Sequence, residues 1–310
     1  MVTSREKLLL RLEWRVIRRL EGRLQGNFRT ANRGAGIDFA GLRAYQEGDD
    51  ARFIDWNVTA RLNEPHIRMF NEDRELTVWL VLDNSASMAA GTPGRDKHDV
   101  LAELALVLAR LFDRGGNRVG ALFYDTGLEH VVPPGKGRRH TLRIGAELNR
   151  AVPGPVATSG RGKKERDGKR TRGATTDLAG MFDAVARLAR RRALILVVSD
   201  FIGEGDWERS LRRLSVRHEV VALRIADVAD DMLPAAGVIV VEDAETGDQL
   251  IVDTSDPLFR ARYRAGVDER DARIETGMSR AGVPVHRVET DGDLGESLVR
   301  IVTRTRERRL

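Results

Sequence analysis

Two short segments made almost entirely of apolar residues constrain the fold of this chain more than any other feature. They are LTVWLVL at residues 76–82 and ALILVVS at residues 193–199. Apolar runs of this length without polar alternation are typical of strands that are buried on both faces. Segments with helical periodicity alternate with such strands along the chain. The pattern predicts an α/β fold with a doubly wound, mostly parallel sheet and helices on both of its faces.

The other elements of the main domain follow from apolar periodicity and turn residues. We expect helices at residues 99–112, 141–152, 177–190, 207–215, 257–281 and 294–308. We expect further strands at residues 118–124, 128–132, 219–225 and 283–288, and a hairpin made of residues 238–242 and 249–252. The main domain is therefore predicted to span residues 73–310.

The first 72 residues differ in character from the rest. Residues 5–24 carry leucine and valine at roughly helical spacing between charged residues, which predicts an amphipathic helix. Five glycines punctuate residues 26–72, and long apolar runs are absent there. We expect residues 1–72 to form this N-terminal helix and a small accessory β segment that packs on the main domain.

Composition excludes several classes of protein. The 310 residues include no cysteine, so disulfides and thiolate metal sites are excluded. No apolar run approaches the ~20 residues that a membrane-spanning helix needs. Charges interrupt the first 24 residues, which therefore lack the uninterrupted apolar stretch of a signal peptide. We therefore expect a soluble, cytoplasmic protein without a membrane span.

Side chains with hard oxygen atoms follow both apolar strands. Asp83, Ser85 and Ser87 follow the first strand, Asp200 follows the second, and Thr176 opens a predicted helix. In an open α/β sheet, ligands bind beyond the carboxyl ends of the strands. Carboxylate and hydroxyl oxygens suit Mg²⁺, Mn²⁺ or Ca²⁺, and a set with only two carboxylates leaves room for an incoming one. The plainer interpretation is that these residues only cap a helix and end a strand.

The pattern Asp83-x-Ser85-x-Ser87, followed by a distant threonine and a distant aspartate, resembles the metal-ion-dependent adhesion site of von Willebrand factor A domains. The resemblance implies that the serines and the threonine contact the ion, while the aspartates act directly or through water. It also implies that an acidic side chain of a protein partner completes the coordination shell. Thr175 could replace Thr176, but the family's threonine is commonly followed by an acidic residue or asparagine.

A second resemblance lies upstream, in the segments Gly36–Phe39, Gly41–Tyr45, Gly48–Arg52, Ile54–Asn57 and Ala60–Arg61. They are similar to the signature of the bacterial domain-of-unknown-function family numbered 58, which also leads into an Asp-x-Ser-x-Ser motif. The resemblance implies a MoxR-type AAA+ ATPase as the partner. The charged residues of the segment could form a paired network that fixes irregular backbone. Together with the tyrosine and tryptophan they could alternatively form a docking surface.

The signatures of common enzymes are missing from the sequence. Gly168-Lys169 is followed by arginine rather than serine or threonine, so there is no phosphate loop, and no Gly-x-Ser-x-Gly elbow occurs. None of the six histidines pairs at metal-ligand spacing. We therefore expect a metal-dependent protein-interaction module and not an enzyme. A metal-dependent hydrolase is an alternative, in which Asp83 or Asp200 would be the base.

A strongly basic segment precedes Thr176. The chain has a net charge of +5, and residues 161–172 alone hold seven Lys/Arg and two Asp/Glu. We expect residues 153–175 to form a loop, which could be no more than a solvated insert. If it borders the metal, its basic residues could steer a partner's acidic side chain; these are Arg161, Lys163, Lys164 and Arg166. Binding of nucleic acid is the alternative, although no aromatic residue is present for base stacking.

Overall fold

A six-stranded sheet forms the centre of the computed structural model, which describes residues 33–34, 38–46, 49–71, 76–89, 91, 94–150, 176–203, 205–242 and 249–298. The sheet has the order β11-β8-β7-β4-β5-β6. Its strands are β4 (Thr77–Asp83), β5 (Arg118–Tyr124), β6 (Leu128–Gly135), β7 (Leu194–Ser199), β8 (Glu219–Ala226) and β11 (Val285–Glu289). Four neighbouring pairs are parallel and the β5–β6 pair is antiparallel, which confirms a mostly parallel sheet.

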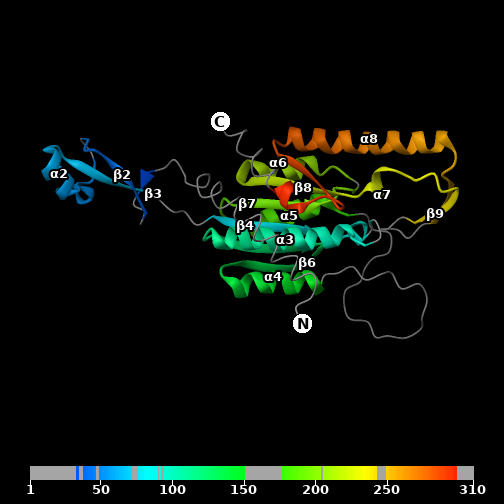
Figure 1. Ribbon diagram of the computed structural model, residues 1–310, viewed down its shortest axis with the longest axis horizontal. Coiled ribbons are helices and arrows are strands. Elements are labelled where there is room, and N and C mark those ends of the chain that lie inside the picture. Colours follow the sequence, from blue (N-terminus) through cyan, green and yellow to red (C-terminus); the bar gives the residue numbers. More distant parts are fainter. Residues whose placement is uncertain are drawn as a thin grey trace.

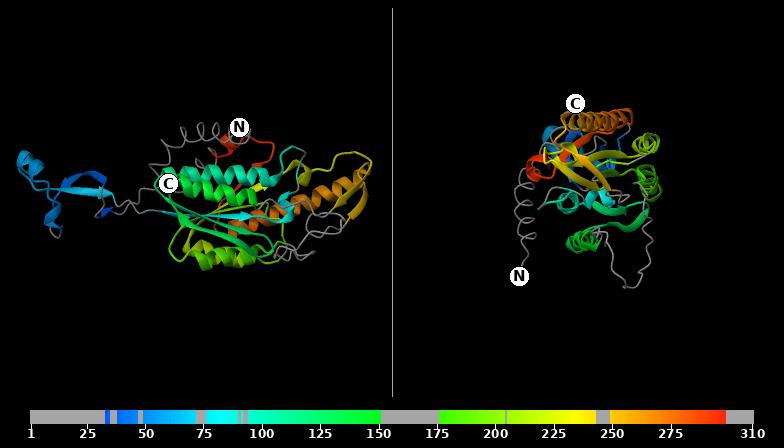
Figure 2. Two further views of the ribbon diagram at one scale, coloured as in Figure 1. Left: turned by 90° about the horizontal axis from the view of Figure 1, so that it is seen from below. Right: turned by 90° about the vertical axis from the view of Figure 1, so that its right-hand side faces the viewer.

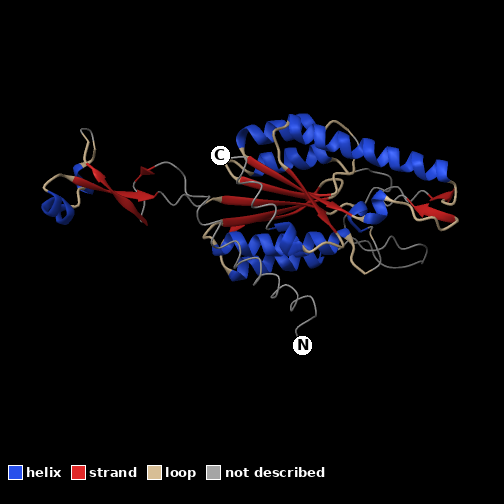
Figure 3. Cartoon of the chain, turned by 45° about the horizontal axis from the view of Figure 1, so that its top comes forward, coloured by secondary structure: helices blue, strands red, loops and turns tan. Residues whose placement is uncertain are grey.

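Helices cover both faces of this sheet, as the pattern predicted (Figures 1 and 3). They are α3 (Lys97–Arg114), α4 (Arg138–Arg150), α5 (Leu178–Leu188), α6 (Glu208–Arg217) and α8 (Pro257–Arg280). Apolar residues of α3 and α4 share one buried cluster with the sheet, and those of α5, α6 and α8 share another. The doubly wound α/β architecture is therefore confirmed.

Strand β4 shows why the apolar segments lack polar alternation. Val78, Leu80 and Leu82 belong to the cluster beneath α3, whereas Trp79 and Val81 belong to the cluster on the opposite face. β4 pairs with β5 on one side and with β7 on the other. Because both faces are covered by helices and both edges are paired, every residue of β4 from Val78 to Asp83 is buried.

Several boundaries differ from the predicted ones for local reasons. β6 continues through Pro133 and Pro134 to Gly135, which an edge strand tolerates because proline lacks only a backbone donor. α4 begins three residues earlier than predicted, at Arg138. The short helix α7 (Val228–Asp231) was not expected, and the side chain of Asp227 caps it by accepting a hydrogen bond from Ala229 N.

The upstream segment forms an antiparallel sheet of the order β1-β3-β2, from β1 (Arg33–Gly34), β2 (Asp38–Ala44) and β3 (His66–Asn71). The predicted β segment is present, but a 3₁₀ turn (Ala51–Phe53) and helix α2 (Trp56–Leu62), which were not predicted, lie between β2 and β3. Asp55 caps α2 by accepting from Asn57 N and Val58 N, and Asn63 ends it with a φ of 56°. These caps stabilise a helix that buries none of its residues.

Charged residues of this segment form ion pairs within it. The Arg43 guanidinium bonds both Asp49 oxygens at 2.6 and 2.8 Å, and Asp55 accepts from Arg68 Nε at 2.8 Å. Trp56, by contrast, is 69% exposed. Figure 1 shows the small sheet apart from the six-stranded sheet, so the structure does not show the expected packing of this segment on the main domain. The boundary between the accessory segment (residues 1–72) and the main domain (residues 73–310) stays a prediction.

β9 (Val238–Glu242) and β10 (Gln249–Asp253) form the predicted hairpin, which lies beyond one end of α8 in Figures 1 and 2. The last predicted helix is described only at residues 294–298, which are helical. The expected helix at residues 5–24 and the basic loop lie outside the described residues. Within the described part of the chain, no helix has the length and apolar character of a membrane span.

Candidate metal centre

The predicted site lies where the two central strands end. β4 and β7 are parallel neighbours, with Leu82 opposite Val198, so Asp83 and the residues after β7 reach the same edge of the sheet. Ser199 Oγ donates to Asp83 Oδ2 at 2.5 Å and connects the two strand ends directly. The chain continues from β4 to β5 on one side, whereas β7 lies on the other. This is the topological switch point, at which open α/β sheets bind ligands.

The two serines of the motif are held side by side in the turn after β4. Ser85 N donates to Asp83 Oδ1 at 3.0 Å, which folds the chain back over the strand end. The short 3₁₀ helix η2 (Ala86–Ala89) follows, and within it Ser87 Oγ lies 3.0 Å from Ser85 Oγ. The backbone thus presents two hydroxyl oxygens to one point beside Asp83.

Thr176 reaches the same edge from a third segment. It precedes α5, whose N-cap is Asp177. Gly203, shortly after Asp200, lies so close that a Cβ atom there would be 2.7 Å from the Thr176 carbonyl oxygen. This close approach, which only glycine permits, places the segment after β7 against the threonine. Thr175 lies outside the described residues.

All five predicted residues are buried, with at most 7% of any of them exposed. They are Asp83, Ser85, Ser87, Thr176 and Asp200. They lie at adjoining strand and helix ends, so the structure brings together three hydroxyl groups and two carboxylates. Their role as metal ligands stays a prediction.

A buried lysine that the sequence analysis missed is part of the same cluster. Lys97 Nζ donates to Asp200 Oδ2 and to Asp230 Oδ2, both at 2.8 Å. Lys97 is the first residue of α3 and is only 1% exposed. Its position was detectable, because it falls four residues before Leu101 on the apolar stripe of α3.

The electrostatics of the cluster are dominated by burial. Burial and the charge of Asp200 raise the pKa of Asp83 to about 7, although the hydrogen bonds from Ser199 and Ser85 oppose this. Burial lowers the pKa of Lys97, but the charges of Asp200 and Asp230 outweigh it and leave that pKa raised. Lys97 is therefore charged at neutral pH, whereas its surroundings disfavour the charged form of Asp83.

The backbone beside Asp200 is strained. Phe201 has a φ of 56° although it is not glycine, and its side chain is buried in the apolar cluster. Its N–H donates to Ser199 Oγ at 2.8 Å, and Ile202 N donates to Asp200 Oδ1 at 3.0 Å. A left-handed residue of this kind costs about 1–3 kcal/mol and persists where its surroundings enforce it. The hydrogen bond from Ile202 N orients the Asp200 carboxylate.

The donor set fits a divalent cation such as Mg²⁺. Hydroxyl and carboxylate oxygens are the ligands that hard cations prefer. Among the described residues, Asp83 accepts from uncharged donors, including Ser85 N and Ser199 Oγ, and has no cationic partner in the interior. A bound cation would supply the missing charge.

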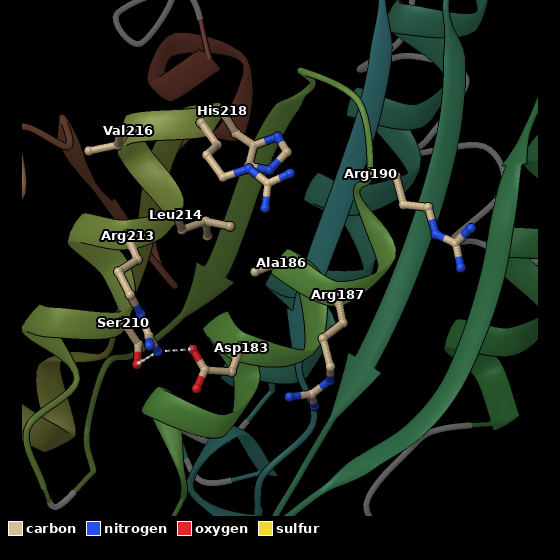
Figure 4. A pocket seen from close by; sticks show the side chains of 10 residues that line it. Asp183, Ala186, Arg187, Arg190, Ser210, Arg213, Leu214, Val216 and His218 are labelled. Atoms are coloured by element: carbon tan, nitrogen blue, oxygen red, sulfur yellow. Dashed lines mark hydrogen bonds and ion pairs between the residues drawn. The ribbon is translucent and has the colours of Figure 1, made fainter.

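A hollow lies between α5 and α6, away from this cluster (Figure 4). It is lined by Asp183, Ala186, Arg187, Arg190, Ser210, Arg213, Leu214, Val216, Arg217 and His218. Arg213 is paired with Asp183 at 2.7 Å. Most of the lining comes from the second halves of both helices, near the amino ends of the strands, whereas the predicted site lies at the carboxyl ends. None of the predicted site residues lies in this hollow.

Comparisons with known proteins agree with the upstream motif. The uncharacterized protein Rv1480 of Mycobacterium tuberculosis is 36% identical over 296 residues, which cover 95% of this chain and 88% of that protein. Among solved structures, BatB from Bacteroides thetaiotaomicron is similar with a TM-score of 0.45 and 13% identity, covering 75% of this chain and 99% of BatB. The SpRpn10 VWA domain is similar with a TM-score of 0.39 and 14% identity, covering 73% and 94%. Residues 41–273 match the family described as "Protein of unknown function DUF58", and the chain belongs to that family.

Proposed function

We propose that this chain is a metal-dependent protein-interaction module. Ser85, Ser87 and Thr176 would hold a Mg²⁺ ion (or Mn²⁺ or Ca²⁺), with Asp83 and Asp200 acting directly or through water. The observation that supports this most is the meeting of three buried hydroxyl residues and two buried carboxylates, from separate segments, at the switch point of the sheet. The three hydroxyl groups and two carboxylates do not fill the coordination shell of the ion, and an acidic side chain of a partner would complete it.

The geometry favours binding over hydrolysis. A pKa of about 7 would suit Asp83 as a general base. However, Asp83 has no exposed surface, and both of its oxygens already accept hydrogen bonds from Ser85 N and Ser199 Oγ. A base must reach the proton that it removes, and the hydrogen bonds and full burial of Asp83 do not favour such a transfer.

The resemblance of the upstream motif supports a MoxR-type AAA+ ATPase as the partner. The chain would act with it as an adaptor or co-chaperone. The exposed side chains of Trp56 and Leu62 on α2 offer apolar contact area in that segment, apart from the metal site.

Binding between the purified chain and a MoxR-type ATPase from the same genome tests both parts of the proposal. We expect binding in Mg²⁺ and at least a tenfold loss in EDTA or in Ser85→Ala/Ser87→Ala, because the ion would then be absent. Ser279→Ala, an exposed serine of α8, is the matched control and should bind normally. Binding that survives both EDTA and the double substitution would refute the metal-dependent role. No binding under any condition would refute this class of partner.

A further inference from the structure

Lys97 is an unusual component of a site for a cation. Lysine is almost never fully buried unless it is paired, and here the side chain is 1% exposed with two carboxylate partners. The partners differ in origin. Asp200 belongs to the predicted site and is as buried as Lys97, whereas Asp230 comes from α7 and has 22% of its side chain exposed.

Both carboxylate oxygens of Asp200 already accept a hydrogen bond, one of them from a charged donor. Its Oδ1 accepts from Ile202 N and its Oδ2 accepts from Lys97 Nζ. The charge of one of the two site carboxylates is thus already balanced from inside the protein. Asp83 has no cationic partner among the described residues, so it brings to the cluster a negative charge that Lys97 does not pair.

We infer that Lys97 sets the affinity of this site, holding it low so that the ion binds firmly only together with a carboxylate of the partner. This inference rests on the proposed function. A fixed positive charge a few ångströms from a bound cation repels it, and in a protein interior that repulsion is worth about a tenfold change in affinity or more. A carboxylate from the partner restores the balance, so the ion and the partner bind with positive coupling.

A purely structural role for Lys97 gives a different expectation. Lys97 also joins the start of α3 to the end of β7 and to α7, so its loss could simply disorder the cluster. In that case any substitution that weakens the arrangement would weaken metal binding. An electrostatic role predicts instead that removing the positive charge and removing a neighbouring negative charge change the affinity in opposite directions.

Calorimetric titration of the full chain with Mg²⁺ alone separates these roles. We expect Lys97→Met to bind Mg²⁺ at least about tenfold more tightly than the unchanged chain. We expect Asp230→Asn to bind it several-fold more weakly, because the lysine then has one less counter-charge. Asp230→Asn keeps the Lys97–Asp200 pair, so it tests the inference even where Lys97→Met does not fold, as judged by circular dichroism.

Two further titrations identify which claim fails. The tighter binding of Lys97→Met must disappear when Ser85→Ala/Ser87→Ala is added. Excess acetate must tighten Mg²⁺ binding to the unchanged chain more than it tightens binding to Lys97→Met.

If the unchanged chain binds Mg²⁺ through the serines but folded Lys97→Met binds equally or more weakly, the inference is overturned and the proposed function stands. The inference is overturned in the same way if Asp230→Asn binds Mg²⁺ as tightly as the unchanged chain. If no variant binds Mg²⁺, both claims are overturned.

Discussion

Replacing Asp200 by alanine is expected to lower the free energy of unfolding by about 3–5 kcal/mol, because it removes one partner of a buried ion pair. Lys97 Nζ would keep only Asp230, whose side chain is partly exposed to solvent. Ile202 N would also lose its acceptor. Urea unfolding followed by circular dichroism, without metal, measures the change.

Two controls separate the buried pair from the loss of any carboxylate. Asp183→Ala breaks the Arg213–Asp183 pair, which has a similar distance of 2.7 Å but lies on the surface. This substitution should lower the free energy of unfolding far less than Asp200→Ala does. In a double-mutant cycle, the loss of unfolding free energy in Asp200→Ala/Lys97→Met should be smaller than the sum of the two single losses, by at least about 1 kcal/mol. Additive losses would show that the two side chains do not stabilise each other.

The affinity for Mg²⁺ is expected to fall about tenfold for each pH unit below about pH 7, and to level off above it. Burial and the charge of Asp200 raise the pKa of Asp83 to about 7, so acid protonates the one site carboxylate that has no cationic partner. Calorimetry from pH 5.5 to 8, in two buffers with different ionisation enthalpies, measures the affinity and the proton released on binding.

The same shift determines how Asp83 contributes to stability. Its folded-state pKa lies above the ordinary value of 3.8, so its favourable contribution is fully present below that value and is lost as the pH rises toward 7. Mg²⁺ should therefore stabilise the chain more at pH 8 than at pH 6. An affinity that does not change across this range would contradict a role for the Asp83 carboxylate in binding the ion.

The main sheet was predictable because burial leaves a pattern in the sequence. Residues 76–82 and 193–199 became β4 and β7, and the helices that cover them followed from apolar periodicity. Helix α2 was missed because its stability comes from Asp55 and Asn63 at its ends rather than from an apolar stripe. The antiparallel direction of β6 followed from the tight turn at residues 125–127, whereas the strand order depends on tertiary packing, which local patterns do not encode.

The candidate site could be predicted in part for the same reason. Asp83, Ser85, Ser87 and Asp200 lie directly after apolar strands, where the fold class places ligands. The place of Lys97 on the apolar stripe of α3 indicated burial, but its pairing with Asp200, 103 positions away, could not be read from any local pattern. Ser199 was missed because it looked like the last residue of an apolar strand, yet it bonds Asp83.

Anomalous diffraction from crystals of the full chain grown with Mn²⁺ tests the central claim most directly. Mn²⁺ takes the same oxygen ligands as Mg²⁺ and has a measurable anomalous signal. We expect one strong peak in contact with the hydroxyl oxygens of Ser85, Ser87 and Thr176, beside Asp83 and Asp200. A map without a peak at these hydroxyls, or with Mn²⁺ bound only elsewhere, would contradict it.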